Sequence, residues 1–339
     1  LSNYLSQLFE IDYFRDLLNK IKINHPFYKF ISKNKYDLII FLGPSQMSKF
    51  CKEVAFISNI WDLDHKKNSQ FPEHNSNNVY EQKEKLFKEI ITRAFKIIVP
   101  HVSNKKDLIN FYKVDDTKII TQNFIPMLPT IYNENKLDKE FYDNLFINFK
   151  LPSNKKIIFY PAQFWAHKNH KYIIDAAEIL KNENNTKFLF VFCGGNKGNF
   201  KYIKDLITKK KLDDIIKILT FVSDDELISL YLNSNGVVMP TYCGPTNLPI
   251  YESFYFKKII FYTKDLIPND LINDHLINID ITSPKDFCSQ LEIYADISKI
   301  EKIVENNYKY YELICDENIF KKNYENILSE FAYLLNRWK

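Results

Sequence analysis

The sequence predicts an α/β protein with two doubly wound parallel sheets, and three observations support this fold class. Short runs rich in Ile, Val, Phe and Tyr alternate with longer segments of helical apolar spacing along most of the chain. Such alternation is typical of parallel sheets whose faces are covered by helices. A chain of 339 residues is also too long for one ordinary core. The alternation is interrupted near Pro126 and Pro129, so we expect two domains.

The first half of the sequence contains four expected strands. The apolar runs at 36–43 and 54–61 are expected to be buried strands. Further strands are expected at 96–100 and 118–121, and helices at 79–95 and 104–112. The proline-containing segment 123–132 is expected to be a linker, and residues 133–154 to be irregular.

The second half shows a more regular alternation. Ser223 and Glu226 have the spacing of a capping box, and Ser283 with Pro284 begins another helix. The expected strands lie at 156–160, 188–194, 215–222, 236–240 and 258–263, and the expected helices at 169–180, 202–208, 224–232 and 249–256. The chain ends in helical patterns.

These elements define the expected domains. Residues 1–129 form a first domain and residues 130–316 a second, and the helix at 317–339 is expected to pack back on the first. The sequence begins with Leu1 rather than Met, and residues 1–35 contain no glycine-rich strand and loop. We therefore expect that the gene product starts upstream.

Composition excludes several classes of protein. The chain is 45% hydrophobic and 26% charged, as in globular proteins, and no apolar run has the length of a membrane span. Five scattered cysteines without a C-x-x-C pair favour reduced thiols in the cytoplasm. Basic residues are almost all lysines, whereas readers of bases prefer arginine, so no nucleic-acid partner is expected. Lysine-rich surfaces also fit peripheral contact with anionic lipid at the inner membrane face.

The first chemistry-bearing stretch is YPAQFWAHKNH, from Tyr160 to His170. It joins an expected strand to an expected helix, where unpaired N–H groups and the helix dipole favour an anion. Lys168 adds a full positive charge at this place, which suits a phosphate or diphosphate. The alternative is a solvated lysine with Asn169 as a simple helix cap. His167 and His170 lack a third ligand at suitable spacing, so no metal site is expected here.

The second stretch is PTYCGPTNLPIYES, from Pro240 to Ser253, which also follows a strand and begins a helix. Gly244 and Pro245 predict a tight loop, and Thr246 and Asn247 offer hydrogen-bonding groups. Glu252 follows one turn inside the helix, and a carboxylate can accept both hydroxyls of a sugar diol. The alternative is a surface glutamate paired with a nearby lysine.

Together these stretches resemble the C-terminal, nucleotide-sugar-binding domain of the retaining GT-B glycosyltransferases of family 4. In that family a lysine after the first strand of the domain contacts the donor diphosphate, and a glutamate after a glycine-rich loop holds the donor ribose. Lys168 and Glu252 occupy those places. The segment WDLDHKKNSQFPEH at 61–74 is similar to a W-D-L-x-H…F-P-E segment of a bacterial subgroup linked to polysaccharide assembly.

The resemblance implies two Rossmann-like domains facing across a cleft, and a transferase that uses a nucleotide-sugar such as GDP-mannose. The acceptor would be a glycan or a lipid-linked sugar, and no cofactor or metal is expected. Lys168 is the expected catalytic group on the donor side, and Asp62 and His65 are expected near the acceptor. The expected donor-binding residues are Gln163, His167, Lys168, Gly244, Pro245, Thr246, Asn247, Leu248 and Glu252.

The sequence also departs from the family pattern. The glycine-rich strand and loop that usually opens the first domain of the family is not recognisable in residues 1–35, so the first domain is expected to lack its first strand. Gly244 stands where many members have an acidic residue, Gln163 stands in place of an arginine, and Trp61 in place of a histidine. Two alternatives follow, namely a non-catalytic scaffold subunit of a glycan-assembly complex and a sugar-nucleotide epimerase. Asp62 and Asp64 also spell D-x-D, the metal–diphosphate signature of the other glycosyltransferase fold, but that fold has a single nucleotide domain.

Overall fold

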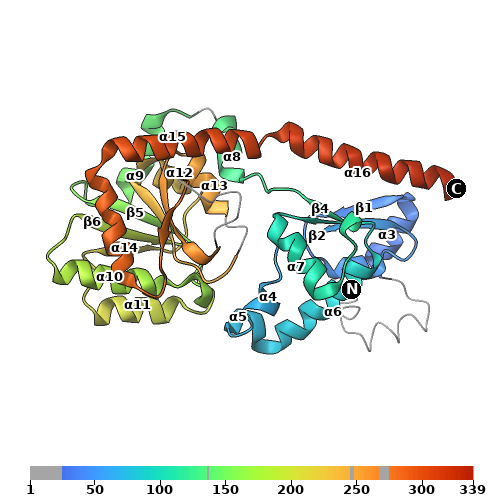
Figure 1. Ribbon diagram of the computed structural model, residues 1–339, viewed down its shortest axis with the longest axis horizontal. Coiled ribbons are helices and arrows are strands. Elements are labelled where there is room, and N and C mark those ends of the chain that lie inside the picture. Colours follow the sequence, from blue (N-terminus) through green and yellow to red (C-terminus); the bar gives the residue numbers. More distant parts are fainter. Residues whose placement is uncertain (1–24, 136, 245–247, 267–274, 339) are drawn as a thin grey trace. The chain divides into compact units, whose positions relative to one another are not determined.

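The computed structural model describes residues 25–135, 137–244, 248–266 and 275–338 (Figure 1). Contacts divide this part of the chain into two compact units. The first comprises residues 25–69, 74–123 and 323–338, and the second residues 70–73 and 124–322. Each unit is built on its own parallel sheet with helices around it, so the predicted class of two parallel-sheet α/β domains is confirmed.

The first unit contains a four-stranded parallel sheet whose strands follow one another in chain order. The strands are β1 (Leu38–Phe41), β2 (Ala55–Asn59), β3 (Lys96–Val99) and β4 (Ile119–Thr121), all at the predicted places. The helices in this half of the sequence are α3 (Pro26–Asn34), α4 (Asp64–Lys67), α5 (Pro72–Asn75), α6 (Val79–Arg93) and α7 (Val102–Tyr112).

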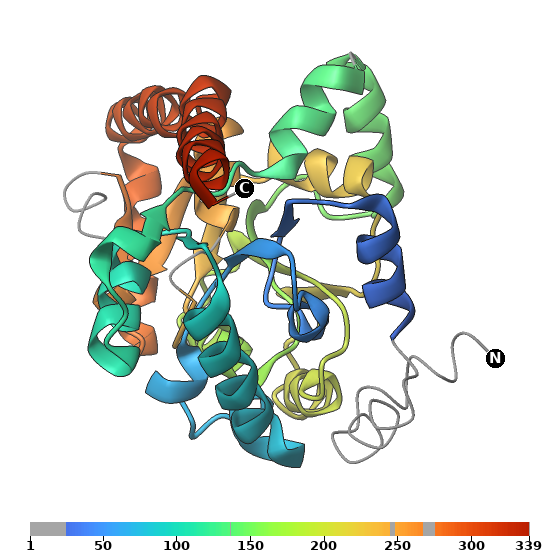
Figure 2. The ribbon, with the colours of Figure 1, turned by 90° about the vertical axis from the view of Figure 1, so that its right-hand side faces the viewer.

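The two faces of this sheet are covered by different helices. Successive strand residues point to opposite faces, and Phe56 and Ile97 share a core with residues of α3, α6 and α7. Ile57 and Ile98 instead contact Ile327 on α16 (Glu317–Trp338), the last helix of the chain. Helices therefore cover both faces (Figures 1 and 2), as expected for a parallel sheet buried on both sides.

The second unit contains a six-stranded parallel sheet with the order β10-β9-β8-β5-β6-β7. The strands are β5 (Lys156–Pro161), β6 (Phe188–Cys193), β7 (Ile216–Leu219), β8 (Gly236–Met239), β9 (Ile259–Thr263) and β10 (Ile277–Ile279). The chain proceeds outward from β5 in one direction and then returns to β8 on its other side. This reversal between β5 and β8 is the topological switch point of a doubly wound sheet, beyond which ligands bind.

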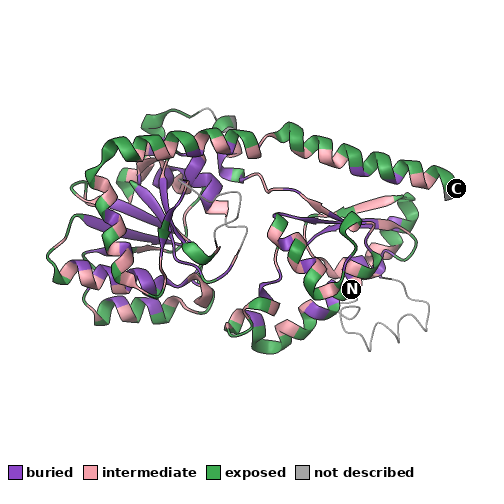
Figure 3. Cartoon of the chain, in the orientation of Figure 1, coloured by how far each residue is buried: buried purple, intermediate pink, exposed green. Residues whose placement is uncertain are grey.

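Helices surround this second sheet, and its four central strands β9, β8, β5 and β6 are almost wholly buried (Figure 3). The helices are α10 (His170–Asn182), α11 (Phe200–Lys209), α12 (Asp224–Asn233), α13 (Leu248–Tyr255), α14 (Pro284–Gln290) and α15 (Ile297–Ile314). The predicted apolar face of α10 is buried, and the capping box of Ser223 and Glu226 is present. Of the helices that the structure describes, none combines the length and apolar character needed to cross a membrane.

Two segments expected to lack regular structure are helical. The predicted linker contains the start of α8 (Met127–Asn135), and the segment expected to be irregular contains α9 (Lys139–Asn148). Pro129 fits because it lies in the first turn of α8, where a backbone N–H has no partner within the helix. Helix α9 begins at a capping bond from the Phe141 amide to Asp138, and it buries Tyr142 completely. Its stability comes from this packing, which sequence periodicity did not reveal.

Candidate functional site

The loops after β5 and β8 meet at the switch point of the second sheet. Because β5 and β8 are neighbours in that sheet, their carboxyl ends lie at one edge. The carbonyl of His167, in the loop after β5, accepts hydrogen bonds from the Tyr242 amide at 2.9 Å and the Thr241 hydroxyl at 3.3 Å. The two stretches singled out by sequence are therefore joined directly, although they are far apart in the chain.

Lys168 ends a short 3-10 turn (Ala166–Lys168) just before α10. The hydroxyl of Tyr160, from the last part of β5, donates to the Lys168 carbonyl. Asn169 follows in the left-handed conformation with φ 54°, and its side chain makes no capping bond. Asn169 is thus the N-cap residue of α10, as the alternative expects, although it caps the helix without a side-chain hydrogen bond. The first turn of α10 contains no acidic residue, so the half-buried Lys168 lies beside a helix start whose own side chains do not offset the positive end of the dipole.

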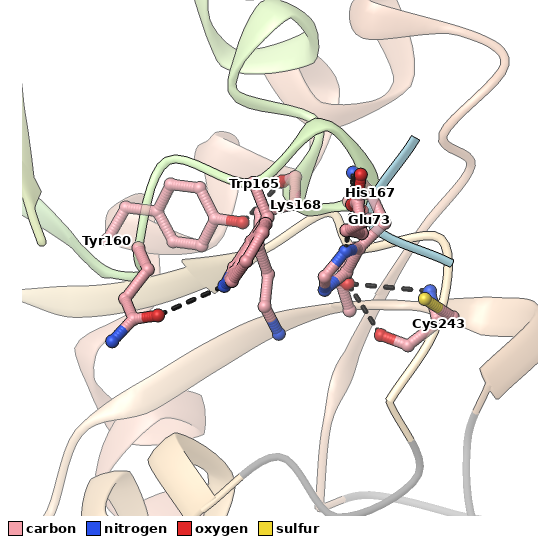
Figure 4. Close-up of polar contacts among 8 residues, drawn as sticks. Glu73, Tyr160, Trp165, His167, Lys168 and Cys243 are labelled. Carbon is pink, nitrogen blue, oxygen red and sulfur yellow. Dashed lines mark hydrogen bonds and ion pairs between the residues drawn. The ribbon is translucent and has the colours of Figure 1, made fainter. Parts of the chain in front are cut away.

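Glu73 holds His167, a contact that we did not expect from the sequence. The His167 amide donates to Oε1 of Glu73 at 2.9 Å, and Nδ1 of the imidazole contacts the same oxygen (Figure 4). Burial by itself raises the pKa of Glu73, but the hydrogen bonds from the amide and ring of His167 outweigh it and hold the pKa below its ordinary value. The F-P-E segment at 71–73 was the only signal in the sequence for Glu73, and its position in the chain did not indicate that His167 would be its partner.

Gln163 lies exposed in the same loop, where its Oε1 accepts a hydrogen bond from the Trp165 indole at 3.0 Å. Gly194, directly after β6, packs against this loop so closely that an added Cβ would lie 2.3 Å from the Ala162 carbonyl oxygen. The amide of Phe164 donates to the Gly195 carbonyl at 3.0 Å. Gly194 of the GGNKGN stretch therefore allows close packing of the loop that carries Gln163 and Lys168, whereas an added Cβ at Gly195 or Gly198 would meet nothing within 4 Å.

Glu252 is buried in α13, with 8% of its surface exposed. The hydroxyl of the fully buried Tyr231, on α12, donates to Oε2 of Glu252 at 2.6 Å. Burial raises the pKa of Glu252 to about 7, and the hydrogen bond from Tyr231 limits this rise. The alternative of an exposed glutamate in a surface salt bridge is therefore wrong. Tyr231 was not among the predicted site residues, since it lies 21 residues earlier on another helix.

The loop between β8 and α13 is described in part. Gly244 has φ +105°, a backbone conformation that residues other than glycine rarely adopt. Leu248 is the first residue of α13 and is partly exposed. The predicted donor-binding residues Pro245, Thr246 and Asn247 lie outside the described residues.

The predicted acceptor-side residues lie in the first unit. Asp62 is partly exposed, and its carboxylate accepts the Asp64 amide at 3.0 Å at the start of α4. His65 is fully buried, with Nε2 placed 2.9 Å from Glu84, and burial lowers its pKa. In this position His65 holds α4 to α6 and presents no surface to an acceptor. Asp64 is also buried, so the D-x-D pair does not form an open pair of carboxylates.

Residues 142–311, just over half of the chain, match the family described as glycosyl transferases group 1. No protein among those with curated functions matches the sequence.

Solved structures provide further similarity. A glycosyltransferase from Rickettsia africae is 18% identical, with a TM-score of 0.68 over 94% of this chain and 88% of that one. HepE from Anabaena, solved with UDP-glucose, is 15% identical, with a TM-score of 0.68 over 96% and 89%. WaaG, a glycosyltransferase of lipopolysaccharide biosynthesis, is 11% identical, with a TM-score of 0.65 over 84% and 76%. At such identities the likeness demonstrates a shared fold.

Proposed function

Because the chain belongs to the glycosyl transferases group 1 family, we propose that it transfers a sugar from a nucleotide-sugar donor to a glycan or lipid-linked acceptor. We further propose that it retains the anomeric configuration and needs no metal ion. One observation carries this proposal: the turn of Lys168, the start of α10 and the buried Glu252 all belong to the two loop–helix segments that follow neighbouring strands. The complexes of the similar HepE with UDP and UDP-glucose support a donor of this class.

The proposed donor lies against the second unit. Lys168, Gln163 and the N–H groups at the start of α10 face the diphosphate, and Glu252 accepts the two ribose hydroxyls. Leu248 and the backbone at Gly244 contact the sugar and the leaving phosphate. A GDP-linked mannose is the donor that the subgroup resemblance favours, with UDP-linked sugars as the competing class.

The proposed mechanism relies on charge stabilisation. As the bond between sugar and diphosphate breaks, negative charge grows on the leaving phosphate, where fixed cationic and dipolar groups act most strongly. The acceptor attacks the same face of the sugar from which the diphosphate departs. We therefore assign no protein nucleophile, and Asp62 is the remaining partly exposed polar candidate on the acceptor side.

Independence from metal gives a direct prediction. Lys168 and the helix start neutralise the diphosphate, and in the described structure Asp62 and Asp64 do not form an open acidic pair. Donor binding and turnover should therefore persist in excess EDTA. Loss of binding with EDTA that manganese restores would instead assign the diphosphate to a bound ion.

A panel of sugar nucleotides tests the function itself. The protein is heated with UDP-, GDP-, dTDP- and CMP-linked sugars, and its midpoint of unfolding is recorded for each. A true donor should raise the midpoint, since binding to the folded state alone stabilises it. Released nucleoside diphosphate is then measured with candidate acceptors. If no sugar nucleotide raises the midpoint or is consumed, the proposed function is wrong.

A non-catalytic binding subunit is the second candidate. Gly244 replaces the acidic residue that many similar enzymes use near the transferred sugar, and His65 is buried. This candidate predicts binding of one sugar nucleotide without its consumption by any acceptor. An epimerase would instead convert the bound sugar nucleotide into an isomer.

We also propose that the protein acts in the cytoplasm, with peripheral contact to the inner membrane face. The five cysteines form no disulfide, in keeping with a reducing compartment.

A further inference from the structure

Residues Gln70–Glu73 make their contacts in the second unit, although the sequence on both sides of them belongs to the first. We propose that Glu73 is a positioning residue, which holds the Lys168 turn and the loop after β8 in the arrangement that binds the donor diphosphate. This inference rests on the proposed function. The family match at 142–311 does not include this segment, so the donor site would depend on residues from the first half of the sequence.

The hydrogen bonds of His167 are the first support. Its amide and its imidazole both contact Glu73, and its carbonyl accepts from Thr241 and Tyr242. Both backbone polar groups of one residue are thus held by partners far away in the chain. Since His167 directly precedes Lys168, these hydrogen bonds hold the backbone from which the lysine side chain extends.

Burial and charge are the second support. The side chain of Glu73 is 6% exposed and that of His167 is 13% exposed. A carboxylate can only accept hydrogen bonds, so Nδ1 of His167 carries the proton in this contact. Removing one partner of such a nearly buried pair is costly, because the other partner loses its compensating group. The pair therefore favours a single position of the loop.

Phe71 adds an apolar contact at the same place. Its ring centroid lies 5.3 Å from that of Tyr242 and 6.2 Å from that of His167. The Gln70–Glu73 segment thus contacts both loops. Glu73 forms polar contacts with His167, and Phe71 packs against the rings of His167 and Tyr242. A carboxylate would repel a diphosphate if it touched it, so Glu73 is suited to holding His167 rather than to contacting the donor.

The first experiment measures affinity in the full-length chain. UDP and GDP are titrated by calorimetry into the parent, Glu73→Ala, Glu73→Gln and the control Glu312→Ala, an exposed glutamate on α15. Whichever nucleotide binds the parent should bind Glu73→Ala about tenfold more weakly, the size expected for one lost charge-assisted hydrogen bond. Glu73→Gln keeps an acceptor for the His167 amide but loses the charge, so a loss of about threefold is expected. Glu312→Ala should bind as the parent does.

The second experiment asks whether Glu73 acts through the Lys168 turn. In a Lys168→Ala background, Glu73→Ala should change affinity by less than about twofold, because effects that share one route are not additive. An equal loss in both backgrounds would show a general effect on the fold and would overturn the proposal. Parent-like affinity of a folded Glu73→Ala would overturn it too.

Two further outcomes are distinguishable. If Glu73→Ala does not fold, the nucleotide affinity of Glu73→Gln tests the proposal instead. An affinity of Glu73→Gln equal to that of the parent would contradict a role for the charge of Glu73 in positioning. If the parent binds neither UDP nor GDP nor any sugar nucleotide of the panel, the proposed function fails before any variant is compared, and the positioning role fails with it.

Discussion

The buried environment of Glu252 departs from what stability alone would select for a carboxyl group. A carboxyl group inside a protein is costly unless it is fully satisfied, and the described structure gives it one hydrogen bond, from Tyr231. Burial raises its pKa to about 7, above the ordinary 4.5. Titratable groups with pKa values perturbed in this way are typical of functional sites.

The pH dependence of stability follows from this shift. Between about pH 4.5 and 7 the folded protein keeps a proton on Glu252 that the unfolded chain releases, so this group contributes stability at low pH that is lost as the pH rises. The Glu252→Gln variant does not lose stability in this way, because glutamine does not titrate. Its free energy of unfolding relative to the parent should therefore rise by about 3 kcal/mol between pH 4 and pH 8. Urea unfolding at several pH values measures it, and a constant difference would contradict the shift.

The same variant should bind the donor less well. If Glu252 accepts both ribose hydroxyls, losing its charge should lower affinity for the matching nucleoside diphosphate about tenfold or more. The effect should vanish with a nucleotide that lacks the 2′- and 3′-hydroxyls. Calorimetry measures the affinity of the parent and the variant for both nucleotides. Equal affinities would show that Glu252 stabilises the fold and does not bind the ribose.

Lys168 is expected to act on the transition state more than on the bound donor. Its charge is best matched to the diphosphate as it separates, so Lys168→Ala should lower kcat by a larger factor than it weakens donor affinity. Lys171→Ala is the matched control, because Lys171 is exposed on the next turn and pairs with Asp175. Unchanged turnover in Lys168→Ala would remove this lysine from the mechanism.

At the scale of elements, the site depends on how closely β6 approaches the loop after β5. Gly194 directly follows β6, and an added Cβ there would be 2.3 Å and 2.8 Å from backbone atoms of Ala162 and Gln163. Gly195 has no neighbour within 4 Å of the same built atom. The chain thus needs glycine at 194 for packing, but not at 195.

This contrast makes a prediction with an internal control. Gly194→Ala should lower the free energy of unfolding by about 2 kcal/mol or more, because neither backbone segment can yield without distorting the sheet. Gly195→Ala should change it by less than about 0.5 kcal/mol. Chemical denaturation measures both, and equal effects would contradict the close approach.

At the scale of the whole molecule, the last helix completes the first sheet. Phe331 on α16 packs edge-on against Phe95 at 5.3 Å, and Glu330 lies 2.8 Å from the ammonium of the mostly buried Lys96. Asn323 donates to Gln122 at 2.5 Å. The end of the described sequence therefore covers a face formed near its beginning.

Substitutions on α16 test this covering role. Phe331→Ala removes a buried ring and should lower the free energy of unfolding by about 3 kcal/mol. Tyr333→Ala, two residues further on at an exposed position, should cost less than about 1 kcal/mol. Similar losses for the two variants would contradict the packing of α16 on the first sheet.

The sequence by itself determined most strands and helices, because the spacing of apolar residues reports which side of each element is buried. It also determined the two loop–helix segments that bear Lys168 and Glu252. In any parallel sheet the helix that follows a buried strand begins with its positive N-terminal end at the carboxyl edge of the sheet. Helices α8 and α9 escaped prediction because packing, not local pattern, stabilises them. Only the tertiary structure decided that Glu73 binds His167 across 94 residues, that Tyr231 donates to Glu252, and that His65 lies in a core. These contacts join residues with no fixed sequence spacing, and long-range contacts of this kind depend on how the elements pack.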